Sequence, residues 1–179
     1  MNKFKDVKKY VLLDRDGTII VDKVYLSDPN LIEFETGAIA GLKLLMKAGI
    51  GLIIVTNQSG IARGLITSDQ LAKIHERLSK LLKDHSINIE AIYFCPHGPN
   101  DECVCRKPKP GMVLQALEKF RIELDSAVLI GDSESDMGAA LTAGIKAIKI
   151  DSLKSEPNSN YLVCNDFLSA AQAAIAILG

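Results

Sequence analysis

Short apolar runs alternate with segments of helical periodicity along most of the chain, and this alternation limits the possible folds more than any other feature of the sequence. Continuous apolar runs are typical of strands that are buried on both faces of a parallel sheet. Parallel strands need crossover connections, and the helical segments have the length that such connections require. The predicted strands occupy residues 10–13, 50–55, 89–94, 127–130 and 147–150.

Five helical segments lie between or after these strands: residues 38–48, a segment that opens at Thr67, residues 109–120, residues 133–143, and an alanine-rich C-terminal segment capped by Asn165 or Asp166. Thr67 and Gln70 have the spacing of a capping box, and Pro110 is expected in the first helical turn. The sequence therefore predicts an α/β fold, a doubly wound, Rossmann-like parallel sheet with helices on both faces. We expect one domain over residues 1–179, a short flap over residues 22–35 and a polar loop over residues 152–160.

The composition limits the partners and the location of the protein. Apolar residues make up 47%, charged residues 24%, and the net charge is −1, so neither nucleic acid nor an anionic membrane is an expected partner. Lys3, Lys5, Lys8 and Lys9 have no aromatic partners, which favours a solvated arm. The N-terminus lacks a signal-peptide apolar run, and no stretch reaches the roughly 20 apolar residues of a membrane span. We expect a cytoplasmic monomer.

Polar and charged residues follow four of the predicted strands. Asp14 and Asp16 follow the first strand, Thr56 and Asn57 the second, Arg106 and Lys107 the third after a cysteine-containing loop, and Asp132 and Asp136 the fourth. Because ligands bind at the carboxyl ends of the strands in such sheets, these residues are expected to meet at one edge. A single charged strand end is usually a solvated turn, but four together favour a functional site.

These residue types predict phosphoryl transfer. The ionised carboxylate of Asp14 can attack phosphorus and form an aspartyl-phosphate. Asp16 shares its side-chain direction, so it can protonate the leaving oxygen and later deprotonate water. Lys107 can neutralise a phosphoryl oxygen, with Thr56 and Asn57 as further donors. Mg²⁺ can be held by Asp14, Asp132 and a main-chain carbonyl.

The loop before Arg106 contains three cysteines and one histidine, namely Cys95, His97, Cys103 and Cys105. Three thiolates and one imidazole form a complete tetrahedral zinc set with no open position, which predicts a structural Zn²⁺ rather than a catalytic one. The alternative is a group of buried cysteines beside a chance histidine. Bound zinc would order a loop of low apolar content and fix the direction of Arg106 and Lys107.

Four segments resemble the four motifs of the haloacid dehalogenase superfamily of phosphatases: residues 13–18 (Leu-Asp-Arg-Asp-Gly-Thr), residues 55–57, residues 106–108 and residues 131–136. The resemblance spans about residues 10–150 with the motifs in the family's order. It implies that Asp14 is the nucleophile, Asp16 the acid/base, and Thr56 and Lys107 the groups that stabilise the phosphoryl group. It also implies Mg²⁺ ligands at Asp14, the Asp16 carbonyl and Asp132, with Asp136 as a supporting residue that orients Lys107 or a metal-bound water.

The zinc loop and residues 56–64 together resemble the D-glycero-D-manno-heptose 1,7-bisphosphate phosphatases. The resemblance implies hydrolysis of the C7 phosphate of a phosphorylated sugar that supplies lipopolysaccharide or another glycosylated surface. The phosphate that is not hydrolysed needs cations of its own, for which Arg63 and Arg106 are the candidates, although Arg63 is also compatible with an ordinary surface position. Substrate-facing roles are further implied for Asp22, Lys23, Val24, Tyr25, Asn57, Gln58 and Ser59.

Several alternatives remain open from the sequence. Histidinol-phosphate phosphatases share the zinc loop and most motifs, and a polynucleotide 3′-phosphatase or a non-catalytic zinc-stabilised scaffold are further possibilities. The absence of a basic stripe disfavours the nucleic-acid substrate, and the complete set of acids disfavours the scaffold. Ser133 departs from the pattern, because many similar proteins carry a lysine there. His75 and His85 are expected to be solvated residues of a helix.

Overall fold

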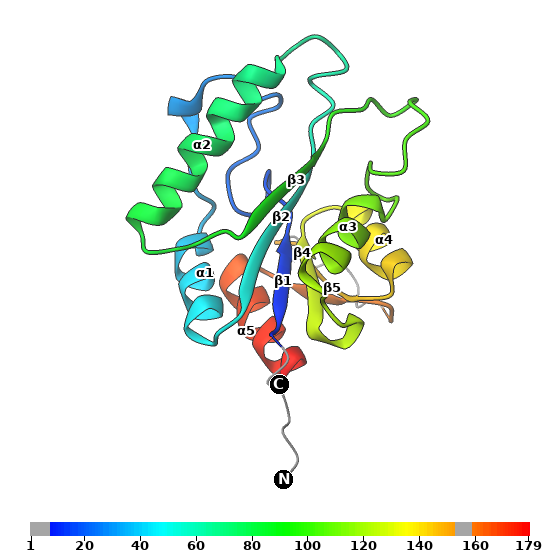
Figure 1. Cartoon of the computed structure of the whole chain (residues 1–179). Coiled ribbons are helices and arrows are strands. Elements are labelled where there is room, and N and C mark those ends of the chain that lie inside the picture. Colours follow the sequence, from blue (N-terminus) through cyan, green and yellow to red (C-terminus); the bar gives the residue numbers. More distant parts are fainter. Residues whose placement is uncertain (1–7, 153–158) are drawn as a thin grey trace.

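The computed structural model describes residues 8–152 and 159–179. Lys3, Lys5 and most of the predicted loop at residues 152–160 lie outside the described residues. The six strands form one parallel sheet in the order β3-β2-β1-β4-β5-β6 (Figure 1). They are β1 (Tyr10–Leu13), β2 (Gly51–Asn57), β3 (Ala91–Cys95), β4 (Ala127–Gly131), β5 (Lys146–Ile150) and β6 (Leu162–Cys164).

Helices cover both faces of the sheet, which confirms the predicted fold class (Figure 1). The core on one face holds alternate strand residues such as Val11 and Leu13 against α1, α2 and α5, and the core on the other holds Tyr10 and Leu12 against α3 and α4. The helices are α1 (Ala38–Lys47), α2 (Ser68–Asp84), α3 (Gly111–Phe120), α4 (Glu134–Ala143) and α5 (Phe167–Leu178), with short 3₁₀ turns η1 (Pro29–Leu31) and η2 (Leu124–Ser126).

The helix starts follow the predicted capping chemistry with one difference. Thr67 and Gln70 form the capping box of α2, and Asp166 rather than Asn165 caps α5. Pro110 was predicted to lie in the first turn of α3, but it is the N-cap of that helix. Its carbonyl accepts the first helical hydrogen bond, from Leu114 N at 2.9 Å, and this is the role of an N-cap carbonyl.

The predicted set of strands lacked β6, which pairs with β5 at the edge of the sheet. It has three residues and follows a polar segment, so neither its length nor its pattern separates it from a loop. The flap contains η1, and Ile20 at its base bridges to both Asp16 and Phe34. No helix in the described parts of the chain is long and apolar enough to cross a membrane.

The strand order places the loops after β1 and β4 side by side. The chain builds outward from β1 through β2 to β3 and then returns to the other side of β1, so the direction of winding switches between β1 and β4. Leu13, the last residue of β1, pairs with both Ile54 and Ile130. In doubly wound sheets this switch point is where ligands bind.

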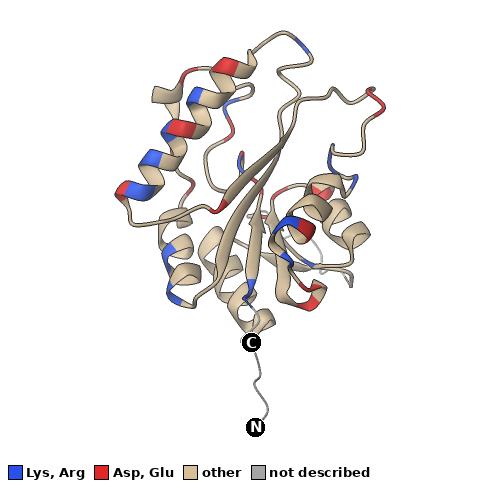
Figure 2. Cartoon of the chain, viewed as in Figure 1, with Lys and Arg blue, Asp and Glu red and all other residues tan. Residues whose placement is uncertain are grey.

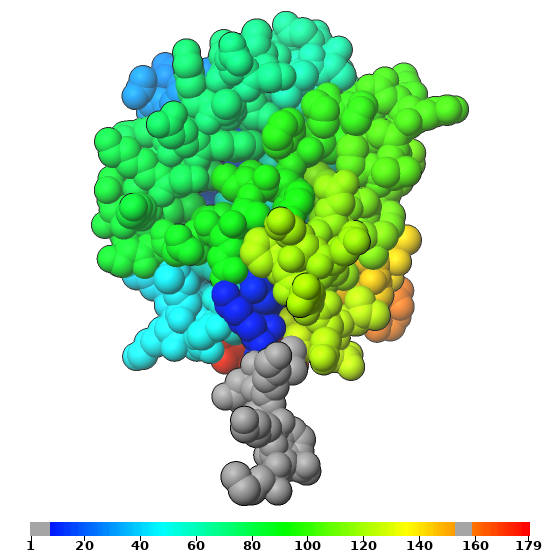
Figure 3. Space-filling model, viewed as in Figure 1, coloured from blue at the N-terminus to red at the C-terminus, as the bar shows by residue number. Residues whose placement is uncertain are grey.

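Helix α2 and the loop after β3 flank the carboxyl ends of the strands. Acidic and basic residues are interspersed along α2 (Figure 2). In the space-filling view, α2 and the loop after β3 occupy the two upper corners of the molecule (Figure 3). The flap, α2 and this loop therefore surround the carboxyl ends of the strands.

Candidate active site

Lys107 lies at the centre of the cluster at the switch point. Its Nζ is 2.8 Å from Asp14 Oδ1 and 2.5 Å from Asp136 Oδ1, and it donates to the Val55 carbonyl at 2.8 Å. The residue is 2% exposed. Asp14 continues the pairing of β1 with β4, because its N–H donates to the Ile130 carbonyl at 2.9 Å. The structure thus brings together four predicted residues that follow three different strands: Asp14 after β1, Lys107 after β3, and Asp132 and Asp136 after β4.

Burial and the neighbouring charges shift the pKa values of the residues in this cluster. Burial raises the pKa of Asp14 to about 7, although the charge of Lys107 opposes that rise. Burial alone would lower the pKa of Lys107, but the carboxylates of Asp14 and Asp136 outweigh it and the pKa is raised. Burial and the charge of Asp136 raise the pKa of Asp132. Three carboxylates around one ammonium leave an excess of negative charge that a cation would relieve.

Two glycines allow the close approach of the carboxylates. A Cβ at Gly17 would lie 2.5 Å from Asp132 Oδ2, and Gly17 also has a φ of +74°. A Cβ at Gly131 would lie 2.4 Å from the carboxyl carbon of Asp136. Asp14, Asp132 and Asp136 can each present an oxygen within 4.8 Å of the others, a separation that fits a shared divalent cation.

Asp136 and Asp132 are themselves held by hydroxyl groups. The Ser133 hydroxyl donates to Asp136 Oδ2 at 2.6 Å, and Ser133 and Asp136 form the capping box of α4. The buried hydroxyl of Thr18 donates to Asp132 Oδ1 at 3.3 Å. No role for Thr18 was predicted, although it belongs to the first motif. Ser133, where many similar proteins have lysine, thus serves here as a cap that orients Asp136.

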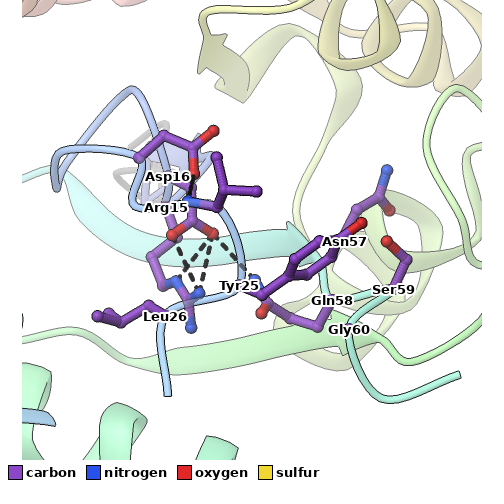
Figure 4. A pocket seen from close by; sticks show the side chains of 10 residues that line it. Arg15, Asp16, Tyr25, Leu26, Asn57, Gln58, Ser59 and Gly60 are labelled. Carbon is purple, nitrogen blue, oxygen red and sulfur yellow. Dashed lines mark hydrogen bonds and ion pairs between the residues drawn. The ribbon is translucent and has the colours of Figure 1, made fainter. Parts of the chain in front are cut away.

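Asp16 faces the pocket from a network of donors (Figure 4). Arg15 donates from Nε to Asp16 Oδ2 at 3.1 Å and from Nη2 to Oδ1 at 3.0 Å. Gln58 Nε2 donates to Asp16 Oδ2 at 2.9 Å and to the Thr56 hydroxyl at 2.8 Å. Gln58 was predicted to contact substrate; it lines the cavity, and its largely buried side chain also supports Asp16 and Thr56.

Two residues of this network were missed or misjudged from the sequence. Arg15 was not predicted to have a role, yet it is 1% exposed and bonded to Asp16. His75 was predicted to be solvated, which is wrong, because its Nε2 lies 3.0 Å from Arg15 Nη1 and its ring packs against Phe94. Burial and the charge of Arg15 lower the pKa of His75 to about 4. His85 is exposed at the end of α2, as predicted.

A cavity of about 240 Å³ opens beside Asp16, and most of the predicted substrate-facing residues line it. Lys23 is not among its lining residues and pairs with Glu33 at 2.8 Å instead. The Arg63 guanidinium lies over the Tyr25 ring at 5.9 Å from its centroid. The lining residues are Arg15, Asp16, Asp22, Val24, Tyr25, Leu26, Asn57, Gln58, Ser59 and Gly60.

Asn57 connects this cavity to Lys107. Its side-chain amide donates to the Lys107 carbonyl at 3.1 Å and accepts from the Lys107 N–H at 3.1 Å. The nitrogen and the oxygen of this amide thus both bond to the main chain of Lys107. Asn57 was predicted to contact phosphate; it lines the cavity, and its side-chain amide holds the main chain of Lys107.

The four residues of the predicted zinc set meet in the loop after β3. Cys95 Sγ lies 3.5 Å from His97 Nδ1, 3.9 Å from Cys103 Sγ and 3.2 Å from Cys105 Sγ. Ligands of a tetrahedral zinc are separated by roughly 3.5–3.8 Å, so the four atoms fit this metal. Arg106 Nη1 donates to the His97 carbonyl at 3.3 Å, which joins the loop to the segment of Lys107.

Known proteins are similar to this chain in sequence and in fold. Residues 104–168 match the HAD-hydrolase-like family. The D-glycero-beta-D-manno-heptose-1,7-bisphosphate 7-phosphatase of Helicobacter pylori (strain ATCC 700392 / 26695) is 40% identical over 165 residues, which are 90% of this chain and 95% of the relative. The enzyme of the same name from Escherichia coli (strain K12) is 40% identical over 142 residues, 75% of this chain and 74% of the relative.

A solved structure agrees with the sequence relatives. The crystal structure of D,D-heptose 1,7-bisphosphate phosphatase from B. bronchiseptica, complexed with magnesium and phosphate, has a TM-score of 0.85 and 30% sequence identity. The similarity covers 94% of this chain and 98% of that one. With its strand order, its carboxylate–lysine cluster and these relatives, the chain belongs to the HAD-like family of D-glycero-β-D-manno-heptose-1,7-bisphosphate 7-phosphatases.

Proposed function

We propose that this protein is a cytoplasmic, magnesium-dependent phosphatase that removes the C7 phosphate of D-glycero-D-manno-heptose 1,7-bisphosphate. The observation that carries the proposal is the contact of Lys107 with both Asp14 and Asp136 beside a cavity lined by Asp16. The proposed product is a sugar monophosphate for the synthesis of lipopolysaccharide or a related surface glycan. The names of the relatives specify the β-anomer, which we propose as the preferred substrate.

Asp14 is the proposed nucleophile. An oxygen of its carboxylate forms a bond to the C7 phosphorus while the bond from phosphorus to the sugar oxygen breaks, which leaves an aspartyl-phosphate. Lys107 supports this step, since its ammonium lies 2.8 Å from Asp14 Oδ1 and can balance the charge of the phosphoryl oxygens. The Thr56 hydroxyl, near Asp16 and Gln58, is a further donor to those oxygens.

Asp16 is the proposed acid and base. It gives a proton to the sugar oxygen that leaves, and it takes a proton from the water that attacks the aspartyl-phosphate. Its place on the cavity wall, two residues after the nucleophile, supports this role. The donors of Arg15 and Gln58 hold the carboxylate in one orientation, which favours proton transfer along a fixed direction.

Asp14, Asp132 and the main-chain carbonyl of Asp16 would hold Mg²⁺, and the spacing of the carboxylate oxygens fits this ion. Bound Mg²⁺ would supply positive charge to the substrate phosphate and offset the repulsion from the acids. Asp136 is a supporting residue, because one of its oxygens faces Lys107 and the other accepts from Ser133. It keeps the lysine directed at Asp14.

The Cys95–His97–Cys103–Cys105 cluster would hold a structural Zn²⁺. Burial raises the pKa of the Cys95 thiol to about 12, so this thiol remains protonated unless a metal displaces its proton. The loop then positions Arg106 and Lys107, which follow its last ligand. Arg106 and Arg63 are the proposed partners of the phosphate at C1. The ring of Tyr25, a residue of the flap, packs against the Arg63 guanidinium.

Asp22, Val24, Tyr25 and Ser59 are proposed contacts of the sugar, since they line the cavity. Asn57 and Gln58 also line it, and we propose that they act mainly through Lys107 and Asp16. Lys23 would need to leave Glu33 to reach the substrate. We further propose that the protein acts as a monomer.

A panel of phosphate-release assays tests this function. We expect kcat/KM for the β-anomer of heptose 1,7-bisphosphate to exceed that for histidinol phosphate and for a 3′-phosphorylated oligonucleotide by at least about 100-fold, a difference that a second phosphate contact accounts for. The α-anomer tests the anomer preference in the same assay. Equal or higher activity on histidinol phosphate would assign the protein to that second candidate function, which shares the zinc loop.

A further inference from the structure

The Arg15 guanidinium connects Asp16 to helix α2. Its Nε and Nη2 donate to the two oxygens of Asp16, at 3.1 and 3.0 Å, in the paired geometry that fixes a carboxylate plane (Figure 4). Its Nη1 lies 3.0 Å from His75 Nε2. Over the described parts of the chain, His75 is the only hydrogen-bond partner of Nη1. A side chain that is 1% exposed cannot replace this partner with bulk water.

Elementary chemistry fixes the direction of the contact between Arg15 and His75. A guanidinium has five N–H donors and no acceptor, so His75 Nε2 must accept and the ring must be neutral with its proton on Nδ1. The surroundings agree, because burial and the charge of Arg15 both lower the pKa of His75. His75 therefore accepts a charge-assisted hydrogen bond across the neutral pH range.

The position of His75 in the fold is also constrained. It follows the buried Ile74 on α2, and its ring meets the ring of Phe94 edge-on at 5.8 Å between centroids. Phe94 belongs to β3, and its ring covers one side of the imidazole without competing for Nε2, because a phenyl ring has no N–H or O–H donor. An apolar residue would fill this space equally well, but it would leave the buried Nη1 of Arg15 without an acceptor.

We propose that His75 is a positioning residue for the phosphatase reaction, which holds the Arg15 guanidinium in the orientation that directs the Asp16 carboxylate into the cavity. The inference rests on the proposed function of Asp16 as the proton donor. In that step the Asp14 oxygen bonds to phosphorus, the bond from phosphorus to the C7 oxygen breaks, and its electron pair takes up the proton of Asp16. A misdirected Asp16 slows this step when the leaving oxygen needs the proton, and it leaves the position of the Asp14 carboxylate unchanged.

The choice of leaving group separates this role from a general structural one. A sugar alkoxide is a poor leaving group and needs the proton, whereas p-nitrophenolate leaves without one. The ratio kcat/KM reports every step up to the first irreversible one, so it includes leaving-group departure and omits the later attack of water. The experiment therefore compares kcat/KM for heptose 1,7-bisphosphate and for p-nitrophenyl phosphate in each variant.

Three substitutions at one position form the test. His75→Leu removes the acceptor, His75→Asn keeps an amide that is too short to reach Nη1, and His75→Gln places an amide oxygen near the position of Nε2. We expect Leu and Asn to lower kcat/KM for the sugar phosphate by about 10- to 100-fold, which is less than the full effect of general acid catalysis because Asp16 itself remains, and for the aryl phosphate by less than about threefold. Gln should recover to within about fivefold of the parent protein.

His85→Leu, near the far end of the same helix, is the matched control and should leave both ratios unchanged. Equal losses on the two substrates, unchanged activity of the Asn variant, or a Gln variant no better than Asn would each overturn the proposal. If the Leu variant does not fold, the Asn and Gln pair decides alone. A parent protein inactive on heptose bisphosphate would refute the proposed function separately, and the variants would then be compared on the best alkyl phosphate found.

Discussion

At the scale of single residues, the site is a balance of buried charges. Asp136 is 0% exposed and Lys107 is 2% exposed, and Asp14 and Asp132 complete a group with three carboxylates and one ammonium. Burial raises the pKa of Asp14 to about 7; the charge of Lys107 opposes this rise, and the charge of Asp136 adds to it. A divalent cation would reverse that effect and favour the ionised nucleophile.

Mg²⁺ affinity should therefore depend on pH. Below about pH 7 the ion must displace a proton from Asp14, so we expect its dissociation constant to rise by about tenfold for each pH unit below 6. Without metal, the raised pKa means that the folded state binds this proton more tightly than the unfolded state. The contribution of Asp14 to stability should then fall as the pH rises from about 4 to 7. Calorimetric titration at pH 6 and 8 measures the proton release, and pH-independent binding would contradict the assignment.

Lys107→Met should remove the only ammonium that contacts both Asp14 and Asp136 among the described residues. We expect kcat to fall by at least about 100-fold, the effect of losing one preorganised charge at a transition state. Chemical unfolding without Mg²⁺ should show a loss of up to about 3 kcal/mol, because two buried carboxylates lose their partner. A variant with nearly normal kcat would show that phosphoryl stabilisation lies elsewhere.

Motif residues could be predicted from the sequence because their types and spacing carry the chemistry. Asp14 and Asp132 lie together as predicted, and in a separate cluster so do the four residues of the predicted zinc set. Arg15 and His75 could not be found in this way, because they are 60 positions apart and meet through side-chain orientation. For Asn57 and Gln58 the location was predicted but not the contacts, since an amide at a strand end can face either substrate or protein.

At the scale of elements, the loop after β3 determines the position of Lys107. Its four candidate ligands lie within 4.8 Å of one another, and Arg106 contacts the His97 carbonyl. The loop has a low apolar content, so the proposed zinc would be its main source of order. Its role is thus to present two cations at the edge of the sheet.

Cys103→Ser should reduce zinc binding and stability. We expect zinc content, measured by elemental analysis, to fall well below one ion per chain and the free energy of unfolding to fall by about 3 kcal/mol or more. Cys164→Ser, at a free cysteine outside the loop, is the control and should keep full zinc content. Parent protein that is purified without zinc and unfolds at the usual temperature would refute the structural role.

The capping box of α2 offers a test of how the sequence specifies an element. Thr67→Ala removes the acceptor of the Gln70 N–H at 3.1 Å, and we expect a loss of about 1 kcal/mol in the free energy of unfolding. Thr67→Ser retains the hydroxyl and should cost less than half of that amount. Equal losses in urea titrations of the two variants would show that the cap does not hold the helix start.

Elements with strong local signals were predicted within a few residues. The five predicted strands and the α2 cap are confirmed, because continuous apolar runs and capping residues act over short distances. The strand β6 was missed because pairing with β5, rather than its own residues, makes it a strand. The start of α3 was predicted two positions too early, at residue 109 rather than Gly111, since Pro110 fits both the N-cap and the first turn.

At the scale of the whole molecule, the strand order turns separate motifs into one site. The doubly wound class followed from the alternation of strands and helices, but the order β3-β2-β1-β4-β5-β6 depends on long-range packing that no segment encodes alone. The reversal at β1 brings the segment of Asp14 beside the segment of Asp132. One domain over residues 1–179 and a monomeric state stay predictions.

The central claim is that Asp14 carries the phosphoryl group during turnover. The most direct measurement mixes the protein with Mg²⁺ and heptose 1,7-bisphosphate, quenches the reaction in acid within milliseconds, and locates the added phosphoryl group by peptide mass spectrometry. We predict that it lies on Asp14 and is absent from the Asp14→Asn variant, which should lose turnover by at least about 10⁴-fold. A phosphoryl group on another residue, or continued turnover by Asp14→Asn, would contradict the account.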